Sequence, residues 1–280
     1  MNAIFSYFTP GRETAPRTDA GEVDSLYRRY RFQVMLAITL GYGVSYTGRL
    51  AMGVVKQPLI DSGVFTAAEL GTIGSALFYT YAFGKLFSGV LADHLHVGRV
   101  MAAAFIGSAL MNLAMGASTG VAAASVIWGL NGLFQSFGAP ACVVALTAWF
   151  SNRERGQMYG VWSTAHSIGE GLTYVLIGGV VAAWGWRAGF FAPTLILLAA
   201  AAGVLLWVRG APKTLGLPAV ADWRDDHATE AKAKADASLT VLASQVNVLK
   251  RPSVWILAGS SALAYVSRYA VSSWGVLYLQ

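Results

Sequence analysis

Long apolar runs separated by short polar segments dominate the chain from Phe32 onward. Such runs reach the length of about 20 residues that a membrane-spanning helix needs. Of the 280 residues, 55% are hydrophobic and 12% are charged, whereas soluble domains carry about 25% charged residues. We therefore expect an all-α polytopic membrane protein. The predicted spans are 32–55, 70–92, 97–117, 121–150, 157–183, 186–208 and 252–279.

The polar segments define the predicted domains. Residues 1–30 contain only a short apolar cluster at 4–8, whereas a secretory signal needs a continuous apolar core of about 7 to 15 residues. We expect a cytosolic tail over 1–30, a six-span bundle over 31–209, a cytosolic linker over 210–251 and a seventh span over 252–280, which begins an incomplete second bundle. Six spans, a long linker and a further span are typical of carriers built from repeated halves.

Local signals predict where helices begin, bend and approach each other. Thr66 and Glu69 precede an apolar run at the spacing of a capping box, which begins a helix. Pro140 lacks a backbone N–H and is expected to break the fourth span locally. Glycines in the first and fourth spans, such as Gly43 and Gly132, let neighbouring helices approach closely.

The distribution of positive charge predicts the orientation. Among 20 Lys and Arg residues, Lys56 and Arg187 lie on the far side, three lie within spans, and the others lie on the near side. Because cytoplasmic loops carry the excess of Lys and Arg, the near side is the cytosol of a bacterial-type inner membrane. The net charge of +6 is then a topology signal, and the sequence has no basic cluster with interleaved aromatics for nucleic acid.

A single cysteine excludes an intramolecular disulfide framework and a multi-cysteine metal site. We expect no metal and no cofactor.

Two arginines inside predicted spans are the first candidates for binding, since an intramembrane charge costs about 2.5 to 3.5 kcal/mol on insertion scales. Arg49 shares a helix face with Tyr42 and Tyr46, and Arg268 shares one with Tyr265. The segments YTGRLAMG and YVSRYAVS around the two arginines also resemble each other. A guanidinium stays charged and binds phosphate oxygens in pairs, so we predict an arginine clamp for an oxyanion. The alternative is that each arginine snorkels or forms a structural ion pair.

The other polar residues of the spans have two interpretations each. Lys85 in the second span is predicted either to contact the same substrate or to pair with Glu170. His166 and Glu170 lie one turn apart in the fifth span and could relay or sense protons, although a single intramembrane histidine is often a packing residue. Asn131 and Gln135 are predicted to form interhelical hydrogen bonds rather than to bind a ligand.

Several motifs resemble those of the major facilitator superfamily. Residues 89–99, GVLADHLHVGR, are similar to its G-x-L-a-D-x-x-G-R signature with one extra residue, and residues 151–156, SNRERG, are similar to its R-x-R-G element. The runs YTGR ending at Arg49, FGK ending at Lys85 and AHSIG around His166 are similar to the organophosphate:inorganic phosphate antiporter branch. That branch includes glycerol-3-phosphate and hexose-phosphate carriers and a related sensor.

The resemblance implies a fold and roles for residues. It implies a major-facilitator-like bundle with alternating access, in which Arg49 and Arg268 hold the phosphate and Lys85 and His166 adjust binding. At the cytosolic side it implies a gate in which Asp93 contacts Arg155 and to which Arg99 also belongs.

Two positions depart from the glycerol-phosphate carriers. Leu50 stands where those carriers have a second cation, which lowers the positive charge of the pocket. Glu170 stands where they have a small residue, which adds a buried carboxylate and suggests charge or proton coupling.

These observations predict a secondary transporter that exchanges an organic phosphate ester, either a sugar phosphate or glycerol phosphate, for inorganic phosphate across the lipid bilayer. A sugar-phosphate sensor that signals to a membrane kinase and a proton-coupled organic anion symporter are the alternatives. A retinal protein is not expected, because the seventh span has no Schiff-base lysine. An enzyme is not expected either, because the sequence has no G-x-S-G-type turn and no H-E-x-x-H helix. A two-halved layout further predicts that the chain is a fragment of a longer carrier or that a second chain supplies the missing half.

Overall fold

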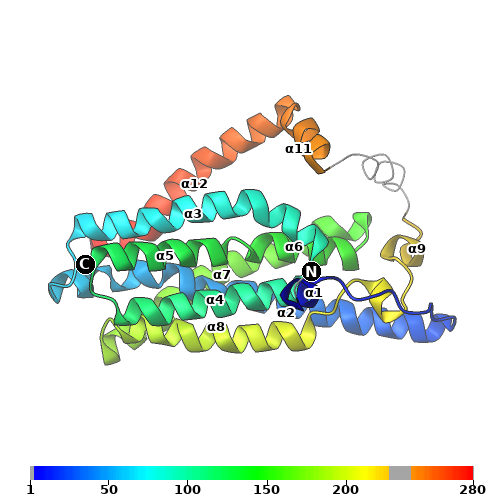
Figure 1. Ribbon diagram of the computed structural model, residues 1–280, viewed down its shortest axis with the longest axis horizontal. Coiled ribbons are helices and arrows are strands. Elements are labelled where there is room, and N and C mark those ends of the chain that lie inside the picture. The colour runs from blue at the N-terminus through cyan, green and yellow to red at the C-terminus, as the bar shows by residue number, and fades with distance from the viewer. Residues whose placement is uncertain (1–2, 227–240, 280) are drawn as a thin grey trace.

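Long helices that run side by side make up the described part of the chain, residues 3–226 and 241–279 (Figure 1). In this computed structural model the inner end of the bundle is where α2 begins, and the outer end is where α2 ends. The helices are α1 (Ala3–Phe8), α2 (Ala20–Asp61), α3 (Ala67–His94), α4 (Val97–Ala117), α5 (Val121–Gln135), α6 (Gly138–Trp149), α7 (Asn152–Trp184), α8 (Ala188–Trp207), the 3-10 helix η1 (Pro212–Leu215), α9 (Val220–Arg224), α11 (Val241–Leu249) and α12 (Pro252–Leu279).

Each predicted span corresponds to helical structure. Among the described residues, four segments are long and apolar enough to cross a membrane: α4, the α5–α6 pair, α7 and α8. The other long helices, α2 with 42 residues and α3 and α12 with 28 each, carry the three cations Arg49, Lys85 and Arg268. Because α1 and the first turns of α2 fall within 1–30, the predicted tail is partly helical.

The fourth predicted span is two helices rather than one. α5 ends at Gln135 and α6 begins at Gly138. Pro140 has no N–H to donate to the carbonyl of Ser136, one turn earlier. Ser88 on α3 uses that freed carbonyl, because its hydroxyl donates to Ser136 O at 3.2 Å. The local break predicted from Pro140 is therefore confirmed, and the continuous helix over 121–150 is wrong.

Glycines set how closely helices pack in the bundle. α2 packs against α7 and α8, α3 packs against α5, and α4 packs against α5 and α8. A Cβ added at Gly169 would lie 2.2 Å from Gly43 O, and one at Gly132 would lie 2.3 Å from Leu77 O. At these points backbone meets backbone without a side chain between them. The first contact holds α7 against α2 directly beside His166 and Glu170.

The predicted capping box at the start of α3 is confirmed. The Glu69 backbone N–H donates to Thr66 Oγ1 at 3.3 Å, and the Thr66 backbone N–H donates to Glu69 Oε2 at 2.7 Å. Hydrogen bonds from the Thr66 backbone and side chain lower the pKa of the Glu69 carboxyl. The cap thus satisfies free amide donors at the outer end of α3.

Aromatic stacking and ion pairs tie the first part of the predicted linker to the inner end of the bundle. Tyr27 on α2 stacks on Trp223 of α9 with ring centroids 4.1 Å apart. Glu154 at the start of α7 pairs with Arg31 at 2.7 Å and with Arg224 at 3.0 Å. The chain therefore remains attached to the bundle as far as α9.

Helix α12 contacts the bundle through its outer part and diverges from it toward the inner end (Figure 1). Near its start, Trp255 is 62% exposed and Leu263 is 76% exposed. Farther along, Lys56 Nζ on α2 donates to Ser273 O at 2.6 Å, and the Tyr174 hydroxyl on α7 donates to Ser272 O at 2.7 Å. Two side chains of the bundle thus hold the backbone of α12 near the outer end.

Candidate binding cavity

A cavity of about 350 Å³ lies between α2, α3, α7 and the outer part of α12. We call it the main cavity. Cationic, aromatic and hydroxyl side chains line it: Tyr42, Tyr81, Lys85, Ala139, Tyr159, Trp162, Ser163, His166, Ser167, Tyr265, Arg268 and Tyr269. Aromatic faces with a few convergent cations are typical of a small-molecule site.

Arg268 enters the main cavity from α12 and is paired with a carboxylate. Its Nη2 donates to Glu170 Oε2 on α7 at 2.5 Å. The other carboxylate oxygen, Glu170 Oε1, accepts a hydrogen bond from the Ser272 hydroxyl. Glu170 therefore contacts α12 through both oxygens. The predicted alternative of a pair between Lys85 and Glu170 is wrong, since Glu170 pairs with Arg268 instead.

His166 lines the same cavity and is held by tyrosines of α2. The Tyr46 hydroxyl and His166 Nδ1 are hydrogen-bonded at 2.6 Å, and the Tyr42 and Tyr46 hydroxyls are 3.4 Å apart. His166 thus bonds to α2, although the sequence suggested a relay with Glu170 on its own helix. The charges of Arg49, Lys85, Glu170 and Arg268 all act on His166, so these groups belong to one electrostatic environment.

Arg49 is 5% exposed and is held by aromatic faces and an amide. Its guanidinium carbon lies 4.8 Å from the ring centre of Tyr46 and 4.5 Å from that of Tyr81. Its Nη2 donates to Gln135 Oε1 at 3.5 Å, which is a long hydrogen bond. Arg49 Nε is buried and has no hydrogen-bond partner among the described residues. This arginine therefore keeps donors that a ligand can use.

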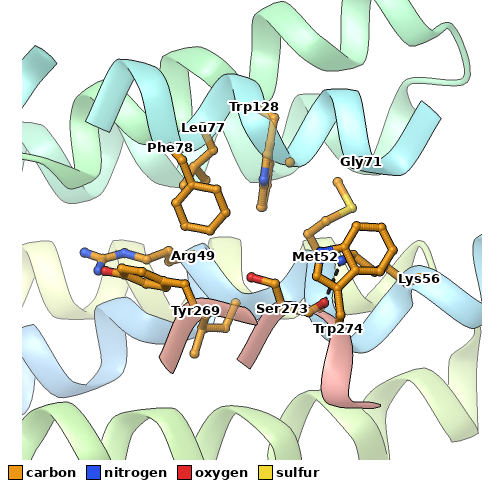
Figure 2. A pocket seen from close by; sticks show the side chains of 13 residues that line it. Arg49, Met52, Lys56, Gly71, Leu77, Phe78, Trp128, Tyr269, Ser273 and Trp274 are labelled. Carbon is orange, nitrogen blue, oxygen red and sulfur yellow. Dashed lines mark hydrogen bonds between the residues drawn. The ribbon is translucent and has the colours of Figure 1, made fainter. Parts of the chain in front are cut away.

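Arg49 lines a second, smaller cavity of about 60 Å³ toward the outer end. In Figure 2, Arg49 and Tyr269 lie at one end of this small cavity, and Lys56 and Trp274 lie at the other. The ammonium of Lys56 lies 3.3 Å from the Trp274 ring centre. Tyr269 lines both cavities.

Lys85 faces the main cavity from α3. Its Nζ lies 4.9 Å from the ring centre of Tyr81, the same ring that faces Arg49. Lys85 itself is exposed, which leaves its charge open to a ligand.

A hydrogen-bond network beside Arg49 confirms the interhelical hydrogen bonds predicted for two amides. Asn131 Nδ2 donates to Gly48 O at 2.9 Å, and Gln135 Nε2 donates to Ser45 O at 3.2 Å. The hydroxyl of Ser108 on α4 donates to Asn131 Oδ1 at 2.6 Å. These bonds join α2, α4 and α5 one turn from Arg49 and fix the backbone that carries it.

The structure brings most predicted site residues together, yet it does not form the predicted clamp directly. Arg268, Lys85, His166, Tyr42 and Tyr265 line the main cavity. Arg49 lies across Tyr269 in the small cavity, and Tyr46 connects the two because its ring faces Arg49 while its hydroxyl bonds to His166. A ligand held by both arginines must therefore extend across both cavities, which share Tyr269.

The predicted gate residues have other partners at the inner end. Arg99 donates to Tyr7 O and lies over the Tyr7 ring at 4.7 Å. Arg155 donates to Phe150 O at 3.3 Å. The side chain of Asp93 lies outside the described residues, so its predicted contact with Arg155 stays a prediction.

Sequence reasoning missed the roles of three residues. Tyr81 provides a face for both Arg49 and Lys85, Tyr269 lines both cavities, and Lys56 holds α12. The i, i+4 spacings from Tyr81 to Lys85 and from Tyr265 to Tyr269 were available as signals. No sequence spacing links Lys56 to Ser273.

Spanning-length helices around a cationic cavity define a polytopic membrane protein of the transporter class. The sequence profile of the Major Facilitator Superfamily matches residues 38–280. The chain belongs to the major facilitator superfamily.

Similarity to three relatives places the chain within the organophosphate transporter branch. Membrane sensor protein UhpC of Salmonella typhimurium is 35% identical over 266 residues, 94% of this chain and 60% of that protein. A probable hexose phosphate transport protein of Chlamydia trachomatis is 32% identical over 291 residues, 100% of this chain and 63% of that protein. The glycerol-3-phosphate transporter of Haemophilus influenzae is 30% identical over 294 residues, 99% of this chain and 61% of that protein. These relatives are named as transporters or a sensor, not as enzymes, and the chain spans less than two thirds of their length.

Solved structures confirm the fold class. A bacterial homolog of the human lysosomal transporter Spinster, in an inward-facing and unoccupied conformation, matches with a TM-score of 0.60 at 20% identity, over 66% of this chain and 44% of that chain. The peptide transporter POT matches with a TM-score of 0.52 at 16% identity, over 92% of this chain and 54% of that chain. At these identities the likeness concerns the fold alone.

Proposed function

We propose that the chain binds the phosphate group of an organic phosphate ester, a sugar phosphate or glycerol phosphate, and exchanges that ester for inorganic phosphate by alternating access. The observation that carries the proposal is the convergence of Arg49, Lys85 and Arg268, from three different helices, on adjoining cavities. The branch to which the relatives belong supports the same class of substrate.

The chemistry of the cavity favours phosphate over a neutral or monoanionic ligand. Two guanidinium groups can donate parallel hydrogen bonds to phosphate oxygens, and Lys85 adds a point charge. Of these three cations, Arg268 pairs with a carboxylate, that of Glu170. The aromatic rings of Tyr42, Trp162 and Tyr265 supply faces for the organic part of the ester.

The contacts of α12 support alternating access. At the outer end, Lys56 and Tyr174 hydrogen-bond to the α12 backbone. Toward the inner end, α12 diverges from the bundle and its side chains are exposed. The hydrogen bonds that these side chains make to the α12 backbone therefore lie toward the outer end. Exchange requires the outer contacts to open when the inner end closes.

A sensor is the second candidate, and the relative at 35% identity supports it, since that protein is named as a membrane sensor. A sensor needs the same phosphate-binding cavity but not the transfer of its ligand across the membrane. Binding alone does not distinguish the two functions.

Counterflow in proteoliposomes tests the transport function. We expect vesicles loaded with inorganic phosphate to take up labelled glycerol 3-phosphate or hexose 6-phosphate and to release labelled phosphate in exchange. Protein-free vesicles and vesicles with Arg49→Lys are the controls. A folded chain that binds the ester but exchanges none of it would rule out the carrier and favour the sensor.

A further inference from the structure

Glu170 has a position that the phosphate-binding function does not by itself require. Its carboxylate pairs with Arg268, which lines the main cavity that must attract an anion. Its side chain is 18% exposed, and that of Arg268 is 35% exposed. A carboxylate at this place lowers the positive potential that a phosphate meets.

Both oxygens of Glu170 are used on α12. Oε2 accepts from Arg268 Nη2 at 2.5 Å, and Oε1 accepts from the Ser272 hydroxyl. The carboxylate thus satisfies one of the two arginines in the way a phosphate oxygen would. The other arginine, Arg49, has no carboxylate partner among the described residues and retains an unpartnered Nε.

We propose that Glu170 is an internal anion that occupies Arg268 and competes with the incoming phosphate for it. The inference rests on the proposed phosphate site and adds a specificity-determining residue to it. A ligand reaches Arg268 only if its own charge outweighs the carboxylate.

The charges of the site make this competition selective. Arg49, Lys85 and Arg268 provide three positive charges, Lys56 adds a fourth at the far end of the small cavity, and Glu170 provides one negative charge. A phosphate monoester dianion together with Glu170 balances the charges of Arg49, Lys85 and Arg268, so the carboxylate can move off Arg268. A monoanion, such as a carboxylic acid ligand, leaves one positive charge unbalanced. We therefore expect Glu170 to disfavour monoanions relative to phosphate monoester dianions, which predominate above pH 7 because the second pKa of a phosphate monoester is about 6.

The bridge also joins two parts of the molecule that must move apart. Glu170 lies on α7 in the bundle, while Arg268 and Ser272 lie on α12. When phosphate replaces the carboxylate at Arg268, a direct link between α7 and α12 is released. Binding and helix movement are thereby coupled through one residue.

The test is the affinity of purified Glu170→Gln chain for inorganic phosphate, measured by titration calorimetry at pH 7.5 beside wild type. If the carboxylate occupies Arg268 in about nine molecules of ten, its removal tightens apparent binding about tenfold. Glu154→Gln is the matched control, because it makes the same change on the same helix at the inner end. Ser272→Ala removes one tether of Glu170 without adding a buried amide, and we expect it to tighten binding by a smaller factor.

The outcomes separate this inference from the proposed function. If wild type binds phosphate, and both Glu170→Gln and Ser272→Ala bind it no more tightly, Glu170 is a structural partner of Arg268 and the inference fails. If neither wild type nor the variants bind inorganic phosphate or glycerol 3-phosphate, the phosphate site itself fails. A merely structural role for Glu170 lowers thermal stability but does not raise affinity, so a gain in affinity supports competition.

Discussion

Arg49 and Arg268 occupy matching sequence segments, yet their surroundings differ. Arg49 is almost fully buried, with its guanidinium against the rings of Tyr46 and Tyr81 and a long hydrogen bond to Gln135. Arg268 is half-buried and forms a short ion pair with Glu170. One arginine is held by groups without charge, and the other is neutralised.

This difference shows how one site can both attract an anion and release it. An arginine held by aromatic rings keeps its full charge in a low-dielectric environment, where attraction for a phosphate is strong. An arginine with a carboxylate partner offers less attraction, because the ligand must compete with that partner. We infer that Arg49 provides most of the binding energy and that Arg268 responds to the ligand.

The largest effect is expected for Arg49→Lys. An ammonium cannot donate two parallel hydrogen bonds or stack its plane on a ring, so affinity for glycerol 3-phosphate should fall about 100-fold, or about 2.8 kcal/mol. Titration calorimetry of the purified chain measures it, with Arg187→Lys outside the cavities as control. Affinity within threefold of wild type would remove Arg49 from the site.

A carboxylate placed beside Arg49 should make the two arginine regions alike. In Gln135→Glu, the new side chain reaches the guanidinium that Gln135 contacts now, and we expect phosphate affinity to fall about 30-fold because Arg49 becomes paired. Gln135→Leu is the control, since it removes the amide without adding charge. Equal phosphate affinities of the Glu and Leu variants would show that a carboxylate beside Arg49 does not weaken phosphate binding.

Arg268→Lys should have a smaller effect than Arg49→Lys. The lysine can keep an ion pair with Glu170, and the arginine it replaces is already neutralised, so we expect about a tenfold loss of affinity. The same titration measures it. A loss of affinity as large as that of Arg49→Lys would mean that both arginines contribute equally to phosphate binding. The different surroundings of the two arginines would then not change their binding energies.

The smallest effect is expected for Tyr174→Phe, which removes one hydrogen bond between α7 and α12 without touching an arginine. A hydrogen bond contributes about 1 kcal/mol, so amides near Ser272 should exchange about fivefold faster with deuterium. Mass spectrometry of peptides from α12 reports the rates, with peptides from α4 as internal control. Unchanged exchange would mean that this bond does not hold α12.

The sequence predicted the helices well and the partners of the charged residues poorly. Apolar run length determines where a spanning helix lies, and α4 begins and ends at the predicted residues. Pro140 predicted the break between α5 and α6 because its missing N–H is a local property. These features depend on residues within a few positions of one another.

Partners of charged residues depend on which helix faces lie together across the bundle. The sequence offered Lys85 as a partner for Glu170, whereas the packing of α12 against α7 brings Arg268 to it. Tyr269 was part of a recognised motif, yet its place between two cavities follows from the approach of α12 to α2. Long-range geometry of this kind has no signature in residue spacing.

Equilibrium binding of labelled inorganic phosphate to the purified chain tests most directly whether the two arginines form one phosphate site. We expect saturable binding of one phosphate per chain that glycerol 3-phosphate displaces and glycerol does not. In a chain with both Arg49→Lys and Arg268→Lys, this binding should be lost. Equal phosphate binding by that folded double variant and by wild type would refute the assignment.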